Sequence, residues 1–346
     1  MTSIKVYKPE DREAWDHYIL SHALAGPYLT SSWKEAIEHS YGHRTMYLIS
    51  RDGDFITGVL PMVLIKPFLG RAGLISLPYC DYGGLITDSL DGAGSLLEKA
   101  LELAAENKAA LEIRNAHVLP WAERELVQIT EKCRMTMQLP DSSEQLWKSF
   151  KSKLRSQIKR PVKEGLVSRL GSTEMIQDFY RVFCRNMRDL GSPVHSSQWI
   201  NCLVKSFGEN ARVCVVYKDG SPVAGGILLL HARTATVPWA STLRGFNRLS
   251  PNMLLYWTFL EYAADNGFAC FDFGRSSPGE GTYLFKKQWG AKPEPLGWYR
   301  LAGVGSANGT SGVNGSLRCT GERIWRSLPL PAANFLGPRI RKYIDL

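Results

Sequence analysis

The chain has 346 residues, of which 44% are hydrophobic and 22% are charged, and its formal net charge is +9. It is too long for one ordinary domain, so we expect two domains that each bury a core of their own. Its seven cysteines are odd in number and lack CxxC spacing, which argues against a disulfide framework or a zinc knuckle and favours a reducing compartment.

The polar N-terminal stretch MTSIKVYKPEDREAW lacks the apolar core of a signal peptide, and no apolar run approaches the ~18 residues of a membrane span. We therefore expect a cytoplasmic protein with at most surface contact to a membrane. Positive charge is concentrated in residues 143–169 and 317–346. An anionic partner is expected to bind there.

The first half of the chain opens with a predicted strand at 4–7, followed by helices that begin near Glu10 and span 31–40. The turn Asp52-Gly53 separates two apolar runs, 45–50 and 55–65, which is a strong hairpin signal. The other elements expected in this half are a strand through 78–84, a helix over 95–108, a strand over 110–113, a helix over 122–133 and a strand over 135–139.

The second half repeats this order. The DG turn at Gly53 recurs at Gly220, and the helix and strand around Ala104 recur around Ala263. Such spacing predicts two lobes of one topology, each an antiparallel meander interrupted by helices, with a binding cleft between them. The alternative is that any mixed α/β protein shows echoes of this kind.

A basic helix is predicted over residues 143–163, between the two halves. Apolar residues recur every four positions as its buried stripe: Leu146, Phe150, Leu154 and Ile158. Cations form a second stripe beside it: Lys148, Lys151, Arg155 and Lys159. Because these cations face almost no acidic residue, they are not arranged as salt-bridge pairs. They either bind a phosphate or pyrophosphate, with Arg155 and Lys159 as candidates, or form a solvated cationic face.

Residues 268–298 combine a strand, a loop and a short helix. Phe271 and Phe273 alternate with polar or small residues as in a half-buried strand, and the glycines that follow end it. Arg275 and Ser276 are therefore expected on a loop at the carboxyl end of the strand. A helix is expected over 282–289, ended by glycine and proline.

The run FDFGRS followed by YLFKKQWG resembles the C-terminal motif of the FemA/FemB-related transferases, which are built from lobes of the N-acetyltransferase (GNAT) type. The resemblance extends from about Ile4 to Leu301, and the tail is similar to that of FemAB-like proteins associated with exopolysaccharide and PEP-CTERM systems. It implies an α+β fold of two tandem GNAT-like lobes, residues 1–140 and 141–301, followed by a flexible linker and basic tail, 302–346.

In the GNAT fold an R/QxxGxG/A segment holds the pyrophosphate of acetyl-CoA on amides at a helix N-terminus. This chain has RGFNRLSPNMLLYW there and lacks the paired glycines. Ser250 is expected to cap the helix, with Pro251 at its first position, so that Asn252 lies either beside a ligand phosphate or within an ordinary cap. The resemblance implies acetyl-CoA, another acyl-CoA or an aminoacyl-tRNA as co-substrate, and no tightly bound cofactor.

Acyl transfer to an amine needs a deprotonated nucleophile and donors that stabilise the oxyanion. Lys286 resembles the lysine of the family's Phe-Lys pair, with Phe285, and is expected to stabilise an oxyanion or phosphate; the alternative is a surface cation. For Asp272 the sequence leaves three roles open: it acts as a base, it orients the amine, or it caps the turn that follows it. The guanidinium of Arg275 suits a carboxylate or phosphate.

Further substrate contacts are expected from Ser276 and Tyr283, and from Asp81 and Tyr82 in PYCDYGG, which either meet the acceptor or form a structural turn. No metal is expected, because only His39 and His43 lie four residues apart and no third ligand is evident. The sequence also lacks a GxSxG elbow and a Walker loop.

These observations predict an acyltransferase that moves an acyl or aminoacyl group onto an amine or hydroxyl of a cell-envelope saccharide or peptidoglycan-type precursor, by direct attack in a ternary complex. The alternative is a non-catalytic tRNA-binding or membrane-surface adaptor for polysaccharide biosynthesis or export. The tail either docks on the lobes or lies on an anionic membrane surface. Prolines at 329, 331 and 338 favour docking, because they prevent a long amphipathic helix.

Overall fold

The computed structural model describes residues 3–67, 70–119, 126–301 and 315–345. They form two compact units. Unit 1 comprises Met1–Cys133, Glu294–Asn314 and Lys342–Leu346, and unit 2 comprises Arg134–Pro293 and Gly315–Arg341. The predicted boundaries at 140 and 301 differ from this division, because the last strand of each predicted lobe belongs to a sheet of the other lobe. The predicted linker at 302–314 lies outside the described residues.

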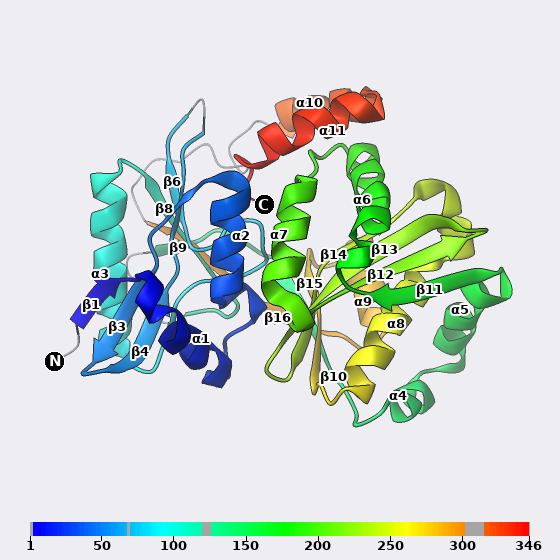
Figure 1. Ribbon diagram of the computed structural model, residues 1–346, viewed down its shortest axis with the longest axis horizontal. Helices are drawn as coiled ribbons and strands as arrows, with labels where there is room; N and C mark the ends of the chain where they lie inside the picture. The colour runs from blue at the N-terminus through cyan, green and yellow to red at the C-terminus, as the bar shows by residue number, and fades with distance from the viewer. Residues whose placement is uncertain (1–2, 68–69, 120–125, 302–314, 346) are drawn as a thin grey trace. The chain divides into compact units, whose positions relative to one another are not determined.

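Unit 1 holds two sheets, with strand orders β1-β3-β4-β7 and β2-β5-β6-β8-β17-β9 (Figure 1). Its apolar core joins both sheets to one face of α3, through residues such as Leu48, Leu74 and Leu97. The elements are β1 (Ser3–Val6), α1 (Arg12–Ser21), α2 (Ser31–Tyr41), β2 (Arg44–Thr45), β3 (Leu48–Asp52), β4 (Phe55–Leu60), β5 (Val63–Ile65), β6 (Gly73–Ile75), β7 (Ile86–Thr87), α3 (Leu90–Glu106), β8 (Ala110–Asn115), β9 (Leu126–Gln128) and β17 (Gly297–Leu301).

The backbone of unit 1 confirms one of the elements predicted from the sequence and contradicts others. The hairpin at Gly53 is confirmed, since β3 pairs antiparallel with β4. The predicted strand over 55–65 is wrong, because it breaks at Pro61 and its two parts belong to different sheets. The predicted strand over 78–84 is also wrong: Leu77 and Tyr79 have φ of 65° and 70°, which a strand does not allow. Residues 126–128 form β9 instead of a helix, and residues 120–125 lie outside the described residues.

Unit 2 holds one sheet, β11-β12-β13-β14-β15-β10-β16 (Figure 1). The elements are β10 (Cys133–Gln138), α4 (Ser143–Ser149), α5 (Ser152–Lys163), β11 (Leu166–Gly171), α6 (Ile176–Leu190), α7 (Ser197–Phe207), β12 (Ala211–Lys218), β13 (Ser221–His231), β14 (Thr234–Thr242), α8 (Pro251–Asp265), β15 (Cys270–Ser276), α9 (Gly281–Gln288), β16 (Lys292–Pro295), α10 (Gly315–Ser327) and α11 (Leu330–Arg341). The predicted helix over 143–163 is two helices, because Phe150 and Lys151 are extended.

Helices α6 and α8 cover opposite faces of this sheet. A Cβ added to Gly225 on β13 would lie 3.2 Å from the Phe179 ring on α6, whereas one added to Gly226 would lie 3.0 Å from the Phe259 ring on α8. Successive residues of a strand point to opposite faces, so the two helices lie on either side. The two glycines allow both helices to approach the same strand closely.

The repeat predicted from the sequence is confirmed by the strand pairing. Each unit contains a parallel pair of strands, β6 with β8 and β14 with β15. Each pair is joined through a helix, α3 in unit 1 and α8 in unit 2, and each pairing covers only three residues per strand. The third position of the pairing holds a buried acid in both units, Glu112 and Asp272.

The units exchange one strand each along the chain. β10 follows the first half in sequence but lies next to β15 in the sheet of unit 2, and β17 follows the second half but pairs with β8 in unit 1. Each exchanged strand brings an arginine to the buried acid: Arg134 Nε lies 2.7 Å from Asp272, and Arg300 Nη2 lies 2.9 Å from Glu112. The exchange therefore joins the two halves of the sequence by ion pairs to buried acids.

The C-terminal helices α10 and α11 pack on α6 (Figure 1). Docking of this part of the tail is therefore observed. Pro329 lies between α10 and α11, so the tail forms two short helices and no long one, as expected, although α11 continues through Pro338 to Arg341. The last described residues belong to unit 1, where Asp345 accepts from Arg114 Nη2 (2.6 Å) and its carbonyl accepts from the Tyr79 amide (2.9 Å).

Candidate functional site

Strands β14 and β15 separate soon after they begin. Their parallel pairing runs from Thr234 with Cys270 to Thr236 with Asp272, although β14 continues to Thr242 and β15 to Ser276. Peptide groups must find a hydrogen-bond partner. Two diverging parallel strands can therefore offer backbone donors and acceptors to a ligand that enters between them.

Asp272 lies at the point of divergence. Its side chain is fully buried, and its carboxylate accepts from Arg134 Nε (2.7 Å) and from the Gly274 amide (2.8 Å). Hydrogen bonds to both oxygens fix the carboxylate and hold the turn that follows. This geometry corresponds to the turn-capping interpretation of Asp272 made from the sequence.

Lys286 is buried and only 7% exposed, so the surface-cation alternative is wrong. Its Nζ donates to the carbonyl oxygens of Gly274 (3.1 Å) and Arg275 (2.7 Å). A lysine on α9 thereby holds the peptide groups at the end of β15. We call this contact the lysine clamp; it fixes the backbone that carries Arg275 and Ser276.

The structure brings the other predicted residues of this segment close to the lysine clamp. Phe285 packs with its ring centroid 5.1 Å from that of Tyr256, which stacks on Phe273 at 5.7 Å. Tyr283 is half-buried, with Lys287 Nζ 5.9 Å from its ring centroid. Phe285 therefore joins α9 to α8 and β15, whereas Tyr283 is accessible to a ligand.

The first turn of α8 follows an irregular N-cap. Ser250 has φ 55° and its side chain makes no capping hydrogen bond, so the predicted cap is wrong. Pro251 occupies the first helical position as expected, and Asn252 is half-buried beside it. An amide such as that of Asn252 at the start of a helix, not satisfied by a cap, suits an anionic group.

The basic helix α5 presents its cations in two directions. Arg155 is half-buried and Lys159 is exposed, with its Nζ 5.4 Å from the ring centroid of Trp147. Neither residue lines the adjacent groove of about 830 Å³, which lies between α4, α5, β10 and α9. That groove has an apolar floor and three lysines: Lys151, Lys153 and Lys287. The sequence pointed to this helix but not to the groove.

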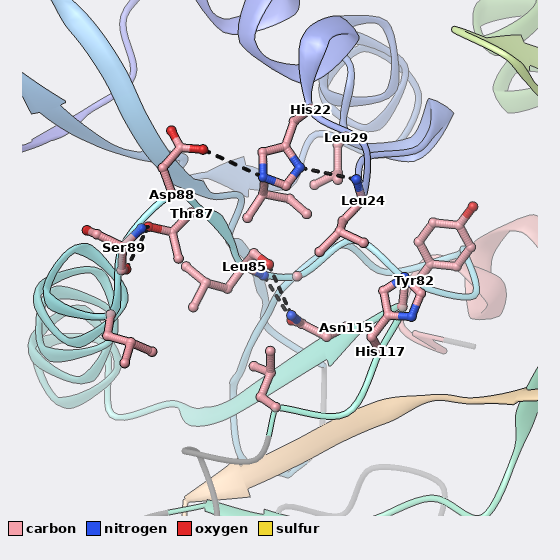
Figure 2. Close-up of a pocket in the computed structure, with 15 residues that line it drawn as sticks. His22, Leu24, Leu29, Tyr82, Leu85, Thr87, Asp88, Ser89, Asn115 and His117 are labelled. Carbon is pink, nitrogen blue, oxygen red and sulfur yellow. Dashed lines mark hydrogen bonds and ion pairs between the residues drawn. The ribbon is translucent and has the colours of Figure 1, made fainter.

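Unit 1 contains a pocket of about 260 Å³ between β7, the start of α3 and the end of β8 (Figure 2). The side chain of Asn115 replaces a strand pairing there, because it accepts from the Leu85 amide (2.9 Å) and donates to the Leu85 carbonyl (3.0 Å). A Cβ at Gly84 would lie 1.8 Å from Asn115 Oδ1, so this position requires glycine. Ser89 caps α3 by accepting from the Gly92 amide at 3.0 Å.

His22 and Asp88 form the ionisable side of this pocket, 3.8 Å apart (Figure 2). His22 Nδ1 accepts from the Leu24 amide at 3.2 Å. Neutral His22 therefore carries its proton on Nε2, the nitrogen that faces Asp88. A carboxylate and an imidazole N–H beside leucine side chains suit a small ligand with an amine or hydroxyl at one end.

Of the pair predicted to contact the acceptor, Asp81 and Tyr82, only one lines this pocket. Tyr82 is buried and lines this pocket, whereas Asp81 does not line it and accepts through its carbonyl from Trp298 Nε1 at 3.1 Å. Sequence reasoning missed His22, Asp88 and Asn115. A usable signal was the polar residue at the end of an apolar strand, as in LEIRN.

In the described part of the chain, no group of three or more histidine, cysteine or acidic side chains is placed to hold a metal ion. No helix there is both long enough and apolar enough to cross a bilayer.

Residues 148–287 match the family model described as an acetyltransferase (GNAT) domain. Among solved structures, FemX has a similar fold, with a TM-score of 0.69 and 14% identity over 86% of this chain and 96% of FemX. No curated protein matches in sequence.

Two further structures share the fold. The C-terminal domain of a putative lysylphosphatidylglycerol synthetase from Agrobacterium fabrum has a TM-score of 0.58 and 13% identity, over 85% of this chain and 93% of that one. A tandem GNAT protein from the clavulanic acid biosynthesis pathway has a TM-score of 0.55 and 12% identity, over 89% and 100%. At such identities the likeness shows the fold, two tandem GNAT-like lobes, as predicted.

Proposed function

We propose that this chain, which has a FemAB-like fold and carries a GNAT acyltransferase domain at residues 148–287, moves an acyl or aminoacyl group onto an amine or hydroxyl of a cell-envelope saccharide or peptidoglycan-type precursor. One observation carries the proposal: the diverging parallel pair β14 and β15, within the matched domain, ends at the lysine clamp. An exopolysaccharide precursor is one acceptor of this class.

For the donor we propose acetyl-CoA, another acyl-CoA or an aminoacyl-tRNA, bound in unit 2. The uncapped first turn of α8 at Asn252 and the guanidinium of Arg275 are suited to the phosphates of any of these donors. The lysine clamp supports this role indirectly, since it orders the peptide that carries Arg275. Arg155 and Lys159 on α5 provide further cations for an anionic or saccharide-linked substrate.

For the acceptor we propose the pocket of unit 1. Its volume of about 260 Å³ accommodates a sugar or one end of an amino acid rather than a whole precursor. Asp88 attracts an ammonium group, and the Nε2–H of His22 can donate to a hydroxyl or carbonyl. Tyr82 forms one wall. Transfer then proceeds by direct attack of the acceptor amine or hydroxyl on the donor carbonyl, which breaks the thioester or ester bond, releases CoA or tRNA as the leaving group, and frees the proton of the acceptor.

The test is a thermal-shift titration with acetyl-CoA, free CoA and aminoacyl-tRNA at low and moderate salt. A ligand at about 100 times its Kd adds about 2.7 kcal/mol to the free energy of unfolding, which raises Tm by a few degrees for units of this size. A shift with acetyl-CoA that persists in salt supports acetyl transfer. A shift with charged tRNA alone supports aminoacyl transfer, and no shift with any donor contradicts the proposal.

A second candidate is a non-catalytic, cytoplasmic adaptor for polysaccharide biosynthesis or export. It would bind tRNA or the surface of the inner membrane. The groove that carries Lys151, Lys153 and Lys287 favours it, because three cations over an apolar floor suit a nucleic-acid backbone. Steep salt dependence of RNA binding, without any transfer to an acceptor, would support this candidate.

A further inference from the structure

Helix α11 has its small and polar residues inside and its large apolar residues outside. Ala333, Gly337 and Arg341 recur at intervals of four and are buried. The outer face holds Phe335, Leu336, Arg339 and Ile340. The three apolar side chains among them are 39–61% exposed. A helix on the surface of a globular protein ordinarily buries its bulky apolar stripe. The orientation of α11 is the reverse.

The inner face is fixed by specific contacts within unit 2. A Cβ at Gly337 would lie 3.1 Å from the backbone nitrogen of Val194, so the helix approaches that segment closely. Arg341 Nε donates to His195 Nε2 at 3.0 Å, and Asn334 Nδ2 donates to Cys184 Sγ at 3.6 Å. These contacts set the rotation of the helix. The exposure of Phe335 is therefore a property of the docked helix.

Cations accompany the exposed apolar residues. The guanidinium of Arg339 lies 3.8 Å from the Phe335 ring centroid, so an aromatic ring and a cation occupy one spot on the surface. On the neighbouring helix α10, Arg323 is exposed beside Ile324, whose exposure is 58%. No carboxylate lies on the outer face of α11, whose sequence LPAANFLGPRIR contains no acidic residue.

We propose that the outer face of α11 docks the protein on an anionic phospholipid surface. Large apolar side chains enter the boundary between headgroups and acyl chains, and arginines beside them attract anionic headgroups. Charge complementarity selects this partner over a neutral apolar surface. The inference rests on the proposed transfer to a cell-envelope precursor and identifies the surface through which the chain contacts a membrane.

The test is flotation of the full chain with vesicles of phosphatidylcholine alone or mixed with phosphatidylglycerol. We expect binding to the mixed vesicles that weakens with salt. The triple variant Phe335→Ser, Leu336→Ser and Ile340→Ser should bind at least about tenfold more weakly, which corresponds to about 1.4 kcal/mol. Arg339→Gln should weaken binding to mixed vesicles about fivefold, the effect of about one cation at an anionic surface.

The matched control is Phe55→Ser, which removes a phenylalanine that is 80% exposed on unit 1 and should leave flotation unchanged. Failure of the wild-type chain to float with mixed vesicles overturns the proposal, as does unchanged binding of the triple variant. A dimer that the triple variant abolishes, without vesicle binding by the wild type, assigns the face to a second copy instead. Flotation needs neither donor nor acceptor, so its failure is distinct from failure of acyl transfer.

Discussion

Replacing Lys286 by methionine removes an ammonium group from the lysine clamp and keeps the length of the side chain. In the wild type this buried ammonium donates to the carbonyl oxygens of Gly274 at 3.1 Å and Arg275 at 2.7 Å. A hydrogen bond from a charged group contributes ~1.5–3 kcal/mol, and a buried acceptor that loses its donor costs ~1–3 kcal/mol. We therefore expect the free energy of unfolding to fall by about 3 kcal/mol.

Urea unfolding measures this change, and transfer rates are then compared at a temperature at which both proteins are folded. Because the clamp orders the peptide of Arg275, we expect turnover of the folded variant to fall by at least about tenfold. The control is Lys287→Met, which removes the neighbouring exposed lysine. It should change the free energy of unfolding by no more than about 0.5 kcal/mol.

Three results would refute this reasoning. If the Lys286 and Lys287 variants unfold at the same urea concentration, the clamp does not stabilise the end of β15. If the Lys286 variant is less stable but keeps its turnover when folded, the clamp has no bearing on transfer. A fall in turnover that follows only the loss of folded protein would likewise leave Lys286 a structural role alone.

Three further predictions concern stability. Arg134→Met should lower the free energy of unfolding by about 3–5 kcal/mol, because the buried Asp272 carboxylate loses its ion pair with Arg134. Adding Asp272→Asn should restore part of this loss, which a double-mutant cycle measured by urea unfolding would show. Burial, together with the nearby Arg341 guanidinium, holds the pKa of His195 well below its usual range. Below about pH 6.5 the unfolded chain therefore binds a proton that the folded chain does not. The free energy of unfolding should fall there by at most about 1.4 kcal/mol per pH unit. His195→Gln should flatten that slope in unfolding curves at pH 7.5 and 5.5, and an unchanged slope would contradict the assignment. Gly84→Ala should lower the free energy of unfolding by at least about 2 kcal/mol, because its Cβ would lie 1.8 Å from an oxygen. Gly94→Ala, in open space on α3, should raise the free energy of unfolding by up to about 1 kcal/mol. Thermal unfolding measures both changes.

The sequence predicts best where local chemistry decides the structure. The turns at Gly53 and Gly220 have φ of 57° and 75°, and each joins antiparallel strands as the DG signal indicates. The lysine-bearing helix after β15 was also predicted, because glycine and proline limit it on both sides. Lys286 and Phe285 therefore lie on the expected element.

The sequence does not predict contacts between residues that are far apart in the chain. Arg134 and Asp272 are 138 positions apart, and Arg300 and Glu112 are 188 apart, so no periodicity connects them. The same holds for the pocket of unit 1, where His22 meets Asp88 only after the fold has formed. The ion pair of Asp272 with Arg134 from β10 is a contact of this kind, and the pattern FDFGRS gives no sign of it.

The exchange of β10 and β17 determines when each unit can be completed during synthesis. The sheet of unit 1 needs residues 297–301, which the ribosome makes only after nearly all of unit 2. Until then the edge of β8 that pairs with β17 is open, and Glu112 lacks its ion pair with Arg300. The N-terminal unit therefore cannot complete its sheet before the C-terminal one has been synthesised, although folding from the N-terminus is the usual order for a chain of two domains.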